Sequence, residues 1–216
     1  MNSHPSSEWL EQFAAGSLSI GQALCVSVHV SQCEDCRRQV NAMQVLGGVL
    51  MESAGAVPVS DRLLDDVFAV IDAQPQAKST EAMPAGASND NMPVQLRKLI
   101  PAGYDALNWT RLLPSMQLAV LDVGDDRCQV SLQRVRPGGR IAMHDHRGTE
   151  LTLVLRGGFS DESGAYQKGD FLVREPNQRH QPIAHQDQEC ICLAAIAAPV
   201  RFTGPLMRWV NPFLRI

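Results

Sequence analysis

The sequence predicts a two-part α+β protein, in which a small all-α domain precedes an all-β sandwich or barrel. Three observations predict this. The front of the chain repeats apolar residues at helical spacing, and the back alternates apolar and polar residues between short turns. A stretch poor in large aliphatic residues separates the two, as is typical of a linker. The expected boundaries are residues 1–74 for the helical domain, 75–93 for the linker and 94–216 for the β domain.

Four helices are expected in the front domain. Trp9, Leu10 and Phe13 share one face of the first, which Ser6 or Ser7 caps and Gly16 ends. The others are expected over residues 20–29, 34–51 and 61–73, the last with Ser60 or Asp61 as its cap. This fourth helix is apolar over a wide arc, through Leu63, Leu64, Val67, Phe68 and Ile71. It either completes the small core or docks on another molecule.

The back half has the period of β-strands. Residues 129–132, 141–144 and 151–155 alternate between apolar and polar or small side chains. Turn sequences intervene, among them Pro137-Gly138-Gly139 and Gly157-Gly158. Many short strands at close spacing are typical of an all-β sandwich or barrel.

Composition excludes several classes of protein. Hydrophobic residues make up 44% of the chain, which is enough for a packed core. The formal net charge is −4, and the acidic excess lies in residues 1–75, so direct nucleic-acid binding is disfavoured. An acidic front suits a basic protein partner, or it is simply a solvated surface. Neither a leader peptide nor a membrane span is apparent, so we expect a cytoplasmic protein with reduced cysteines.

A histidine and two cysteines lie close together before and at the start of the third predicted helix: His29, Cys33 and Cys36. A helix N-terminus favours thiolates, and zinc binds thiolates and imidazoles in closed four-ligand sites. Cys25, one helical turn before His29, and His4, far upstream, are both candidates for the fourth ligand. A redox CxxC pair is the competing interpretation, but that use is expected in a βαβ setting, which this sequence lacks.

A second group of candidate ligands lies in the β half. His144 and His146 are two residues apart, so on a strand they point to the same side. Glu150 follows a short turn, and His180 comes after another strand. Three imidazoles and a carboxylate suit Zn, Mn, Fe, Ni or Cu, and the ligand set alone does not choose among them. The competing interpretation is a pair of surface histidines, and His185 is interpreted as a loop residue.

Cys190 and Cys192 lie in a strand-like stretch, where their thiols share one face. Neighbours at this spacing are poorly placed for a disulfide. The pair is either two small buried hydrophobic residues or a pair of oxidant-sensitive thiols near the second group of ligands. Cys128 is isolated and is interpreted as a core residue.

The front motif, H-x3-C-x2-C between two short helices with a histidine near the chain start, resembles the zinc-binding anti-sigma domain over residues 1–75. The resemblance implies that His4 is the fourth zinc ligand and that Cys25 is a buried small residue. It also implies that the domain holds an extracytoplasmic-function sigma factor, with the fourth helix packed on that partner.

The back motif, G-x5-H-x-H-x3-E-x6-G from Gly138 onward, resembles the first motif of the cupin barrel, a double-stranded β-helix or jelly roll. The second cupin motif matches in part, since Gly169, Pro176 and His180 stand at altered spacing and the closing Asn is missing. The resemblance implies a divalent metal, zinc first, with Mn, Fe or Ni as alternatives. The implied ligands are His144, His146, Glu150 and His180.

The two motifs in this order resemble the ChrR family of anti-sigma factors over nearly the whole chain. The resemblance implies a regulatory binding protein and not an enzyme, with no catalytic residues. The front domain would inhibit the sigma factor, and the cupin domain would release it under oxidative stress from singlet oxygen or organic peroxides. We expect no direct contact with nucleic acid or membrane, and the oligomeric state stays open. The alternative is a metal-dependent cupin enzyme, a dioxygenase or isomerase, with an appended zinc interaction module.

Overall fold

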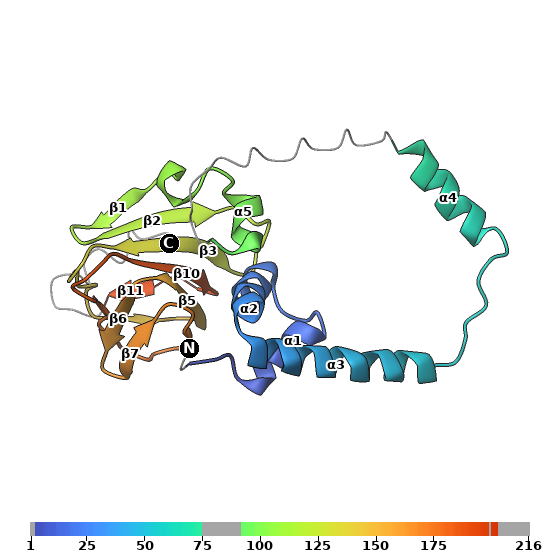
Figure 1. Ribbon diagram of the computed structural model, residues 1–216, viewed down its shortest axis with the longest axis horizontal. Helices are drawn as coiled ribbons and strands as arrows, with labels where there is room; N and C mark the ends of the chain where they lie inside the picture. Colours follow the sequence, from blue (N-terminus) through green and yellow to red (C-terminus); the bar gives the residue numbers. More distant parts are fainter. Residues whose placement is uncertain (1–2, 75–91, 199, 203–216) are drawn as a thin grey trace.

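The computed structural model describes residues 3–74, 92–198 and 200–202 (Figure 1). Most of the predicted linker, residues 75–91, therefore lies outside the described residues, as do residues 203–216 of the predicted β domain. Met92, at the far end of that linker, is buried. The domain boundaries stay a prediction, but the predicted order of helices and then strands is confirmed.

The four predicted front helices are present. They and the two short helices that follow are α1 (Ser7–Ala14), α2 (Ile20–Gln32), α3 (Glu34–Ser53), α4 (Leu63–Ala73), α5 (Val94–Leu99) and the 3-10 helix Tyr104–Ala106. Ser6 stands at the N-cap of α1, as predicted. The cap predicted for α4 is wrong, since Arg62 stands at the N-cap and makes no side-chain cap hydrogen bond. The Ser60 hydroxyl accepts from the Arg62 amide, so Ser60 stabilises the turn before the helix and does not cap the helix itself. None of the described helices is long and apolar enough to cross a membrane.

The strands pair antiparallel and form a barrel. They are β1 (Thr110–Leu113), β2 (Met116–Leu121), β3 (Gln129–Val135), β4 (His144–His146), β5 (Glu150–Arg156), β6 (Gly158–Asp161), β7 (Gly164–Gln167), β8 (Phe171–Arg174), β9 (Ile183–Ala184), β10 (Cys190–Ile196) and β11 (Val200–Phe202). The largest sheet has the order β1-β2-β3-β10-β5-β8, and the smaller sheets have the orders β7-β6-β9 and β11-β4. The strand predicted over residues 141–144 begins only at His144, since residues 141–143 lie outside the regular strands.

The central strands β5 and β10 of the six-stranded sheet are buried on both faces. Leu151, Leu153 and Leu193 pack with α1, α2, α3 and α5 in one hydrophobic cluster. Val154 and Cys192, which alternate with them, belong to a second cluster inside the barrel. The front helices therefore lie on the outer face of the barrel sheet and share its core (Figure 1).

Helix α2 docks by its N-terminus on the turn between β2 and β3. The Asp125 carboxylate accepts a hydrogen bond of 2.7 Å from the Gly21 amide, where the positive end of the helix dipole favours an anion. Burial acts to raise the pKa of Asp125, but hydrogen bonds, first among them that from Gly21, hold it well below its usual range. Close approach at this point requires glycine, because a Cβ on Gly21 would lie 2.4 Å from Val130 Cγ2 and 2.5 Å from Cys128 Sγ.

Gly21→Ala is expected to destabilise the protein by about 1–2 kcal/mol. Overpacking of a tight contact costs roughly 1–3 kcal/mol, and the gain in helix propensity, up to about 1 kcal/mol, offsets only part of it. Gly47→Ala in α3 is the matched control, since its Cβ would meet nothing within 4 Å. That variant is expected to be as stable as the parent or more so. Urea unfolding measures both, and equal stability of the two variants would mean that α2 is not docked as described.

Candidate metal centres and an exposed apolar surface

The four residues expected to bind zinc at the front of the chain come together. In this front site (His4, His29, Cys33 and Cys36) the ligand atoms all lie within 4.8 Å of one another. His4 Nδ1 lies 3.3 Å from His29 Nε2 and 3.4 Å from Cys33 Sγ, and Cys36 Sγ lies 3.4 Å from His29 Nε2. Cys25, the competing candidate for fourth ligand, is not a member of the group.

The spacing of these atoms fits a tetrahedral zinc ion. With bond lengths of about 2.0–2.1 Å to nitrogen and about 2.3 Å to sulfur, tetrahedral angles place two nitrogens about 3.3 Å apart and a nitrogen and a sulfur about 3.5 Å apart. The observed separations of 3.3–3.5 Å have these values. His4 is exposed and the other three residues are buried, so the site is closed on all sides but one.

Burial keeps His29 and Cys36 of the front site uncharged when no cation is present. It lowers the pKa of His29 to about 4, although the hydrogen bond to Gly169 acts in the opposite direction, so the ring is neutral at pH 7. Burial also raises the pKa of Cys36 to about 12. Without a cation that sulfur is therefore a thiol, and metal binding has to release its proton.

The second predicted group also comes together. The barrel site (His144, His146 and His180, with Glu150 beside them) has its histidines within 4.8 Å of one another. His180 Nε2 lies 2.9 Å from His144 Nε2 and 3.0 Å from His146 Nε2. Bonds of about 2.0–2.1 Å meeting at right angles give edges of about 2.9 Å. The histidine spacing therefore fits an ion of higher coordination number than the front site, with positions left open.

Glu150 lies next to this group without completing it. Its Oε2 is 3.0 Å from His146 Nε2, yet it is not one of the atoms that all lie within 4.8 Å of one another. Burial raises the pKa of Glu150, while the nearby His144 and a hydrogen bond from Gln133 act to lower it. A divalent cation at the histidines would stabilise the ionised carboxylate, which suits the predicted role of Glu150 as a ligand.

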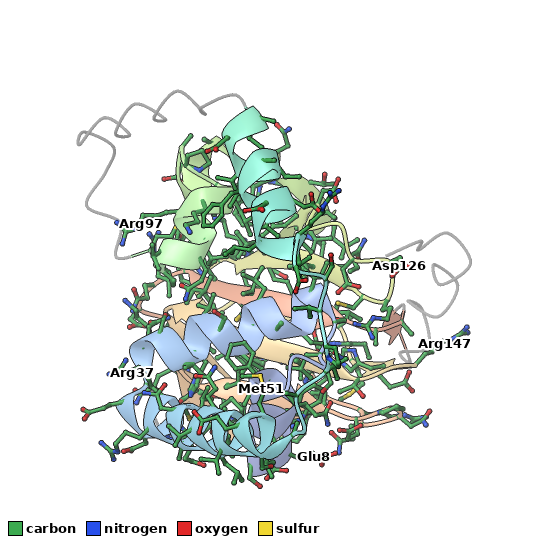
Figure 2. All side chains as sticks on the ribbon, turned by 90° about the vertical axis from the view of Figure 1, so that its right-hand side faces the viewer. Glu8, Arg37, Met51, Arg97, Asp126 and Arg147 are labelled. Carbon is green, nitrogen blue, oxygen red and sulfur yellow. The ribbon has the colours of Figure 1, made fainter. Side chains whose placement is uncertain are left out.

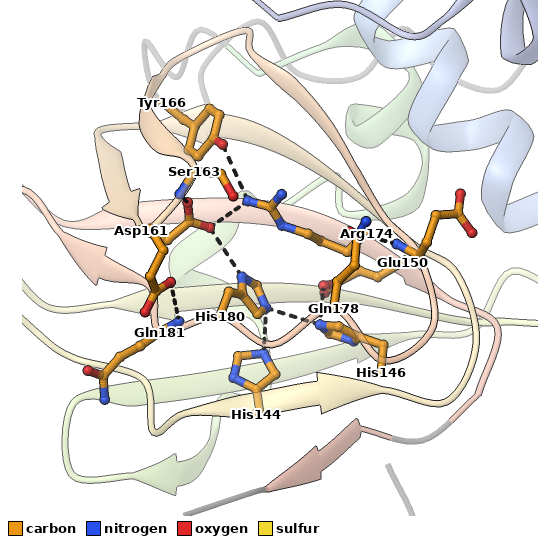
Figure 3. A network of polar contacts seen from close by, with 12 residues as sticks. His144, His146, Glu150, Asp161, Ser163, Tyr166, Arg174, Gln178, His180 and Gln181 are labelled. Carbon is orange, nitrogen blue, oxygen red and sulfur yellow. Dashed lines mark hydrogen bonds and ion pairs between the residues drawn. The ribbon is translucent and has the colours of Figure 1, made fainter.

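Two of the barrel histidines are oriented through Nδ1. His144 Nδ1 lies 2.8 Å from the Ala142 carbonyl oxygen. His180 Nδ1 lies 3.3 Å from Asp161 Oδ2, a contact drawn in Figure 3. Arg174 bonds the same Asp161 oxygen and lies 3.3 Å from the Tyr166 hydroxyl. These contacts leave each Nε2 unprotonated and aimed at the site, as metal-binding histidines require. Burial lowers the pKa of His180 to about 3, and the neighbouring histidines add to this effect.

Sequence reasoning missed these supporting residues. Asp161 ends β6 and Arg174 ends β8, so no fixed spacing connects them to the histidine motif. A metal-binding histidine generally donates its second ring N–H to a carboxylate or carbonyl oxygen, so such acceptors could be expected. The sequence does not show which carboxylate takes this part.

An apolar cavity inside the barrel adjoins these histidines. His144, Glu150 and His180 line it together with Cys190 and Cys192, and its aliphatic wall includes Leu112, Met116, Leu118, Val135, Ile141 and Ile196. The two sulfurs lie 3.6 Å apart, so the predicted shared face is confirmed and the cysteines are free. The hydrogen bond with Cys190 and burial raise the pKa of Cys192 well above its usual value, which keeps it a thiol at neutral pH.

The remaining singled-out residues lie elsewhere. Cys25 is fully buried between the helices and the sheet, and Cys128 is buried 3.2 Å from Asp125. His185 lies outside the strands and 3.3 Å from the Ser160 hydroxyl, apart from the barrel site.

An apolar surface on the outside of the molecule has no partner within the described chain. The α3–α4 surface consists of Val45, Leu46, Val49, Leu50, Met51, Leu63, Leu64, Val67, Phe68, Val70 and Ile71, with exposed fractions from 46% to 75%. No residue of α4 is buried, and α4 stands apart from the other elements (Figure 1). Figure 2 faces this side of the molecule and labels Met51. Of the two alternatives for the fourth helix, the structure therefore favours docking on another molecule. The contribution of α3 was not predicted.

Fold and sites define a two-part protein, in which a helical module with a candidate metal site lies on a barrel with a second candidate metal site. Residues 100–198 match the family model of the ChrR cupin-like domain. The chain is 36% identical to the anti-sigma-E factor ChrR of Cereibacter sphaeroides over 214 residues, which are 99% of this chain and 98% of that one. A crystal structure of Rhodobacter sphaeroides SigE in complex with the anti-sigma ChrR matches with a TM-score of 0.77 and 31% identity, covering 91% of this chain and 99% of that chain.

The chain belongs to the ChrR family of anti-sigma factors. The predicted family, the helical-plus-cupin fold and the prediction of a non-enzymatic role are thereby confirmed.

Proposed function

We propose that this protein binds an extracytoplasmic-function sigma factor through its α3–α4 surface, holds it inactive, and releases it under oxidative stress. The exposed α3–α4 surface is the main observation that supports this proposal. Apolar side chains exposed together over two helices mark a protein interface. Leu63, Leu64, Val67, Phe68 and Ile71 of α4 are the proposed partner-binding residues. The acidic residues of the front part complement the basic faces expected of a sigma factor.

A relative supports this assignment. The crystal structure that matches over 91% of this chain holds the anti-sigma ChrR together with SigE. We extend that pairing to a cytoplasmic sigma factor of the same class here. Residues 1–74 are then the inhibitory domain, 75–93 the linker and 94–216 the responding domain.

The two metal sites have different roles in this proposal. Zinc at His4, His29, Cys33 and Cys36 holds the front helices together, because such small modules fold with their metal. A divalent cation at the barrel site, zinc first and Mn, Fe or Ni as alternatives, supplies a Lewis-acidic centre facing the cavity. His144, His146, Glu150 and His180 hold it. The apolar wall admits a small apolar oxidant such as singlet oxygen or an organic peroxide.

Release requires a large change in free energy. Moving the complex from mostly bound to mostly free takes about 5 kcal/mol of differential stabilisation. Oxidation at the barrel site, or of Cys190 and Cys192 in the same cavity, would alter the cation's surroundings and loosen the barrel under the helices. If the thiols take no part, they are small core residues.

Co-expression with the extracytoplasmic-function sigma factors of the source organism tests the proposal. One of them is expected to form a stable complex and lose transcription activity when bound, and loss of the complex on peroxide treatment is expected to restore it. Failure of every one of these sigma factors to form a complex with the chain would contradict the proposal.

A further inference from the structure

The front site is held in place by the barrel, through residues Gly169, Asp170 and Phe171. His29 Nδ1 donates to the Gly169 carbonyl oxygen at 3.0 Å, which leaves Nε2 for the metal. The Phe171 ring packs against the His29 ring with centroids 5.6 Å apart. The hydrogen bond and the ring contact that orient His29 therefore come from the barrel and not from the front helices.

The second histidine of the front site is attached to the same three residues. Ser3, next to His4 in the chain, accepts from the Phe171 amide at 3.0 Å and donates to Asp170 Oδ1 at 3.2 Å. Asp170 is fully buried, and its other oxygen accepts from the Gln167 amide at 2.9 Å. Both histidines are thus anchored to the start of β8.

The far end of β8 reaches the barrel site. Arg174, the last residue of the strand, bonds Asp161, and Asp161 orients His180. Arg174 also pairs with Glu150 across the β5–β8 ladder. A strand of this length spans roughly 10 Å. The strand therefore contacts the supports of both sites, one at each end.

We propose that β8 couples the two metal sites, so that loss of the barrel cation weakens metal binding at the front site, and the reverse. The strand is a rigid element, and a shift at His180 that moves Asp161 and Arg174 moves Phe171 and the Gly169 carbonyl with it. Arg174 and Asp161 are positioning residues in this scheme, since neither touches the cations. The coupling rests on the proposed occupancy of both sites.

Metal affinities in the full-length chain test the coupling. Zinc affinity of the front site is measured by chelator competition in the parent and in His144→Ala, and Cys36→Ser gives the reverse measurement for the barrel site. Cobalt substituted for zinc absorbs by charge transfer from thiolates, and only the front site has cysteines among its proposed ligands. This absorption therefore shows when the front site holds the ion. Each affinity is expected to fall about 5-fold or more when the other site is emptied, and by the same factor in both directions, because coupling is reciprocal.

Variants that keep both ions test the route. Arg174→Gln and Asp161→Asn are expected to reduce the coupling factor toward one. Arg156→Gln is the matched control, since Arg156 ends β5 and bonds Glu189, away from both sites. Two occupied sites with independent affinities would overturn the coupling and leave the proposed function standing. If either site binds no metal, the coupling and the proposed function are both wrong. If Arg156→Gln reduces the coupling factor as much as Arg174→Gln does, the assignment of the coupling to β8 is wrong.

Discussion

Phe68→Glu is expected to lower the affinity for the sigma factor at least about 30-fold, a loss of about 2 kcal/mol, because a charge would be buried at an aromatic anchor of the interface. Phe68 lies on α4 with 54% of its surface exposed, and no residue of α4 is buried by the described part of the chain, so the substitution should leave the packing of that part intact. The free energy of unfolding should therefore stay unchanged. Titration of labelled sigma factor against the parent and the variant measures the change in affinity.

Val120→Glu is the matched control for that experiment. Val120 is an apolar residue on β2 with nearly the same exposed fraction, 57%, but it lies outside the α3–α4 surface. This variant is expected to bind the sigma factor as the parent does. Equal losses in the two variants would indicate a non-specific effect of charge. Unfolding of the Phe68 variant would mean that α4 completes the core of the chain, and the assignment of this surface would then be wrong.

His144→Ala is expected to keep inhibition and abolish release. The substitution removes one of three converging imidazoles, so the barrel site should lose its cation while α3 and α4 keep their exposed surface. Sigma-dependent transcription should then stay at its unstressed level in cells exposed to singlet oxygen or an organic peroxide. Metal analysis of the purified variant establishes that the front site alone is filled.

His185→Ala provides the comparison, because His185 belongs to the same barrel but lies outside the barrel site. Cells with this variant should respond to the oxidant normally. If His144→Ala cells also respond normally, the barrel cation has no part in the signal. The Cys190→Ser/Cys192→Ser double variant in the same assay decides whether those thiols take part or only fill the core.

Local spacing predicted which of the nearby side chains come together at each candidate site, but it did not predict the packing around them. The motif around His144 and His146 was readable because alternation on a strand places both rings on one side. His4 was identified only by resemblance, since a ligand so far upstream has no local pattern. Its position follows from the bonds between Ser3 and the start of β8, which are set by tertiary contacts.

The alternation in β5 was recognised, but not the fact that both of its faces are covered. Leu151 and Leu153 face the front helices, while Thr152 and Val154 face the barrel interior. A periodic pattern indicates that a strand has two kinds of face, yet it cannot say what lies over each. The close contact of Gly21 with Val130 and Cys128 could not be predicted either. A glycine in a helix does not by itself indicate that another element packs against it.

The leucine-rich outer face of the barrel limits how this architecture can evolve. A domain that is exchanged freely between genes must be soluble alone, whereas this barrel separated from α1, α2 and α3 would expose Leu151, Leu153 and Leu193 to water. Recombination that joins the barrel to an unrelated helical module, with no surface to cover these leucines, is therefore expected to produce an aggregating protein. The helical part and the barrel are expected to be inherited as a pair, with compensating changes at residues such as Gly21 and Val130 where their surfaces meet.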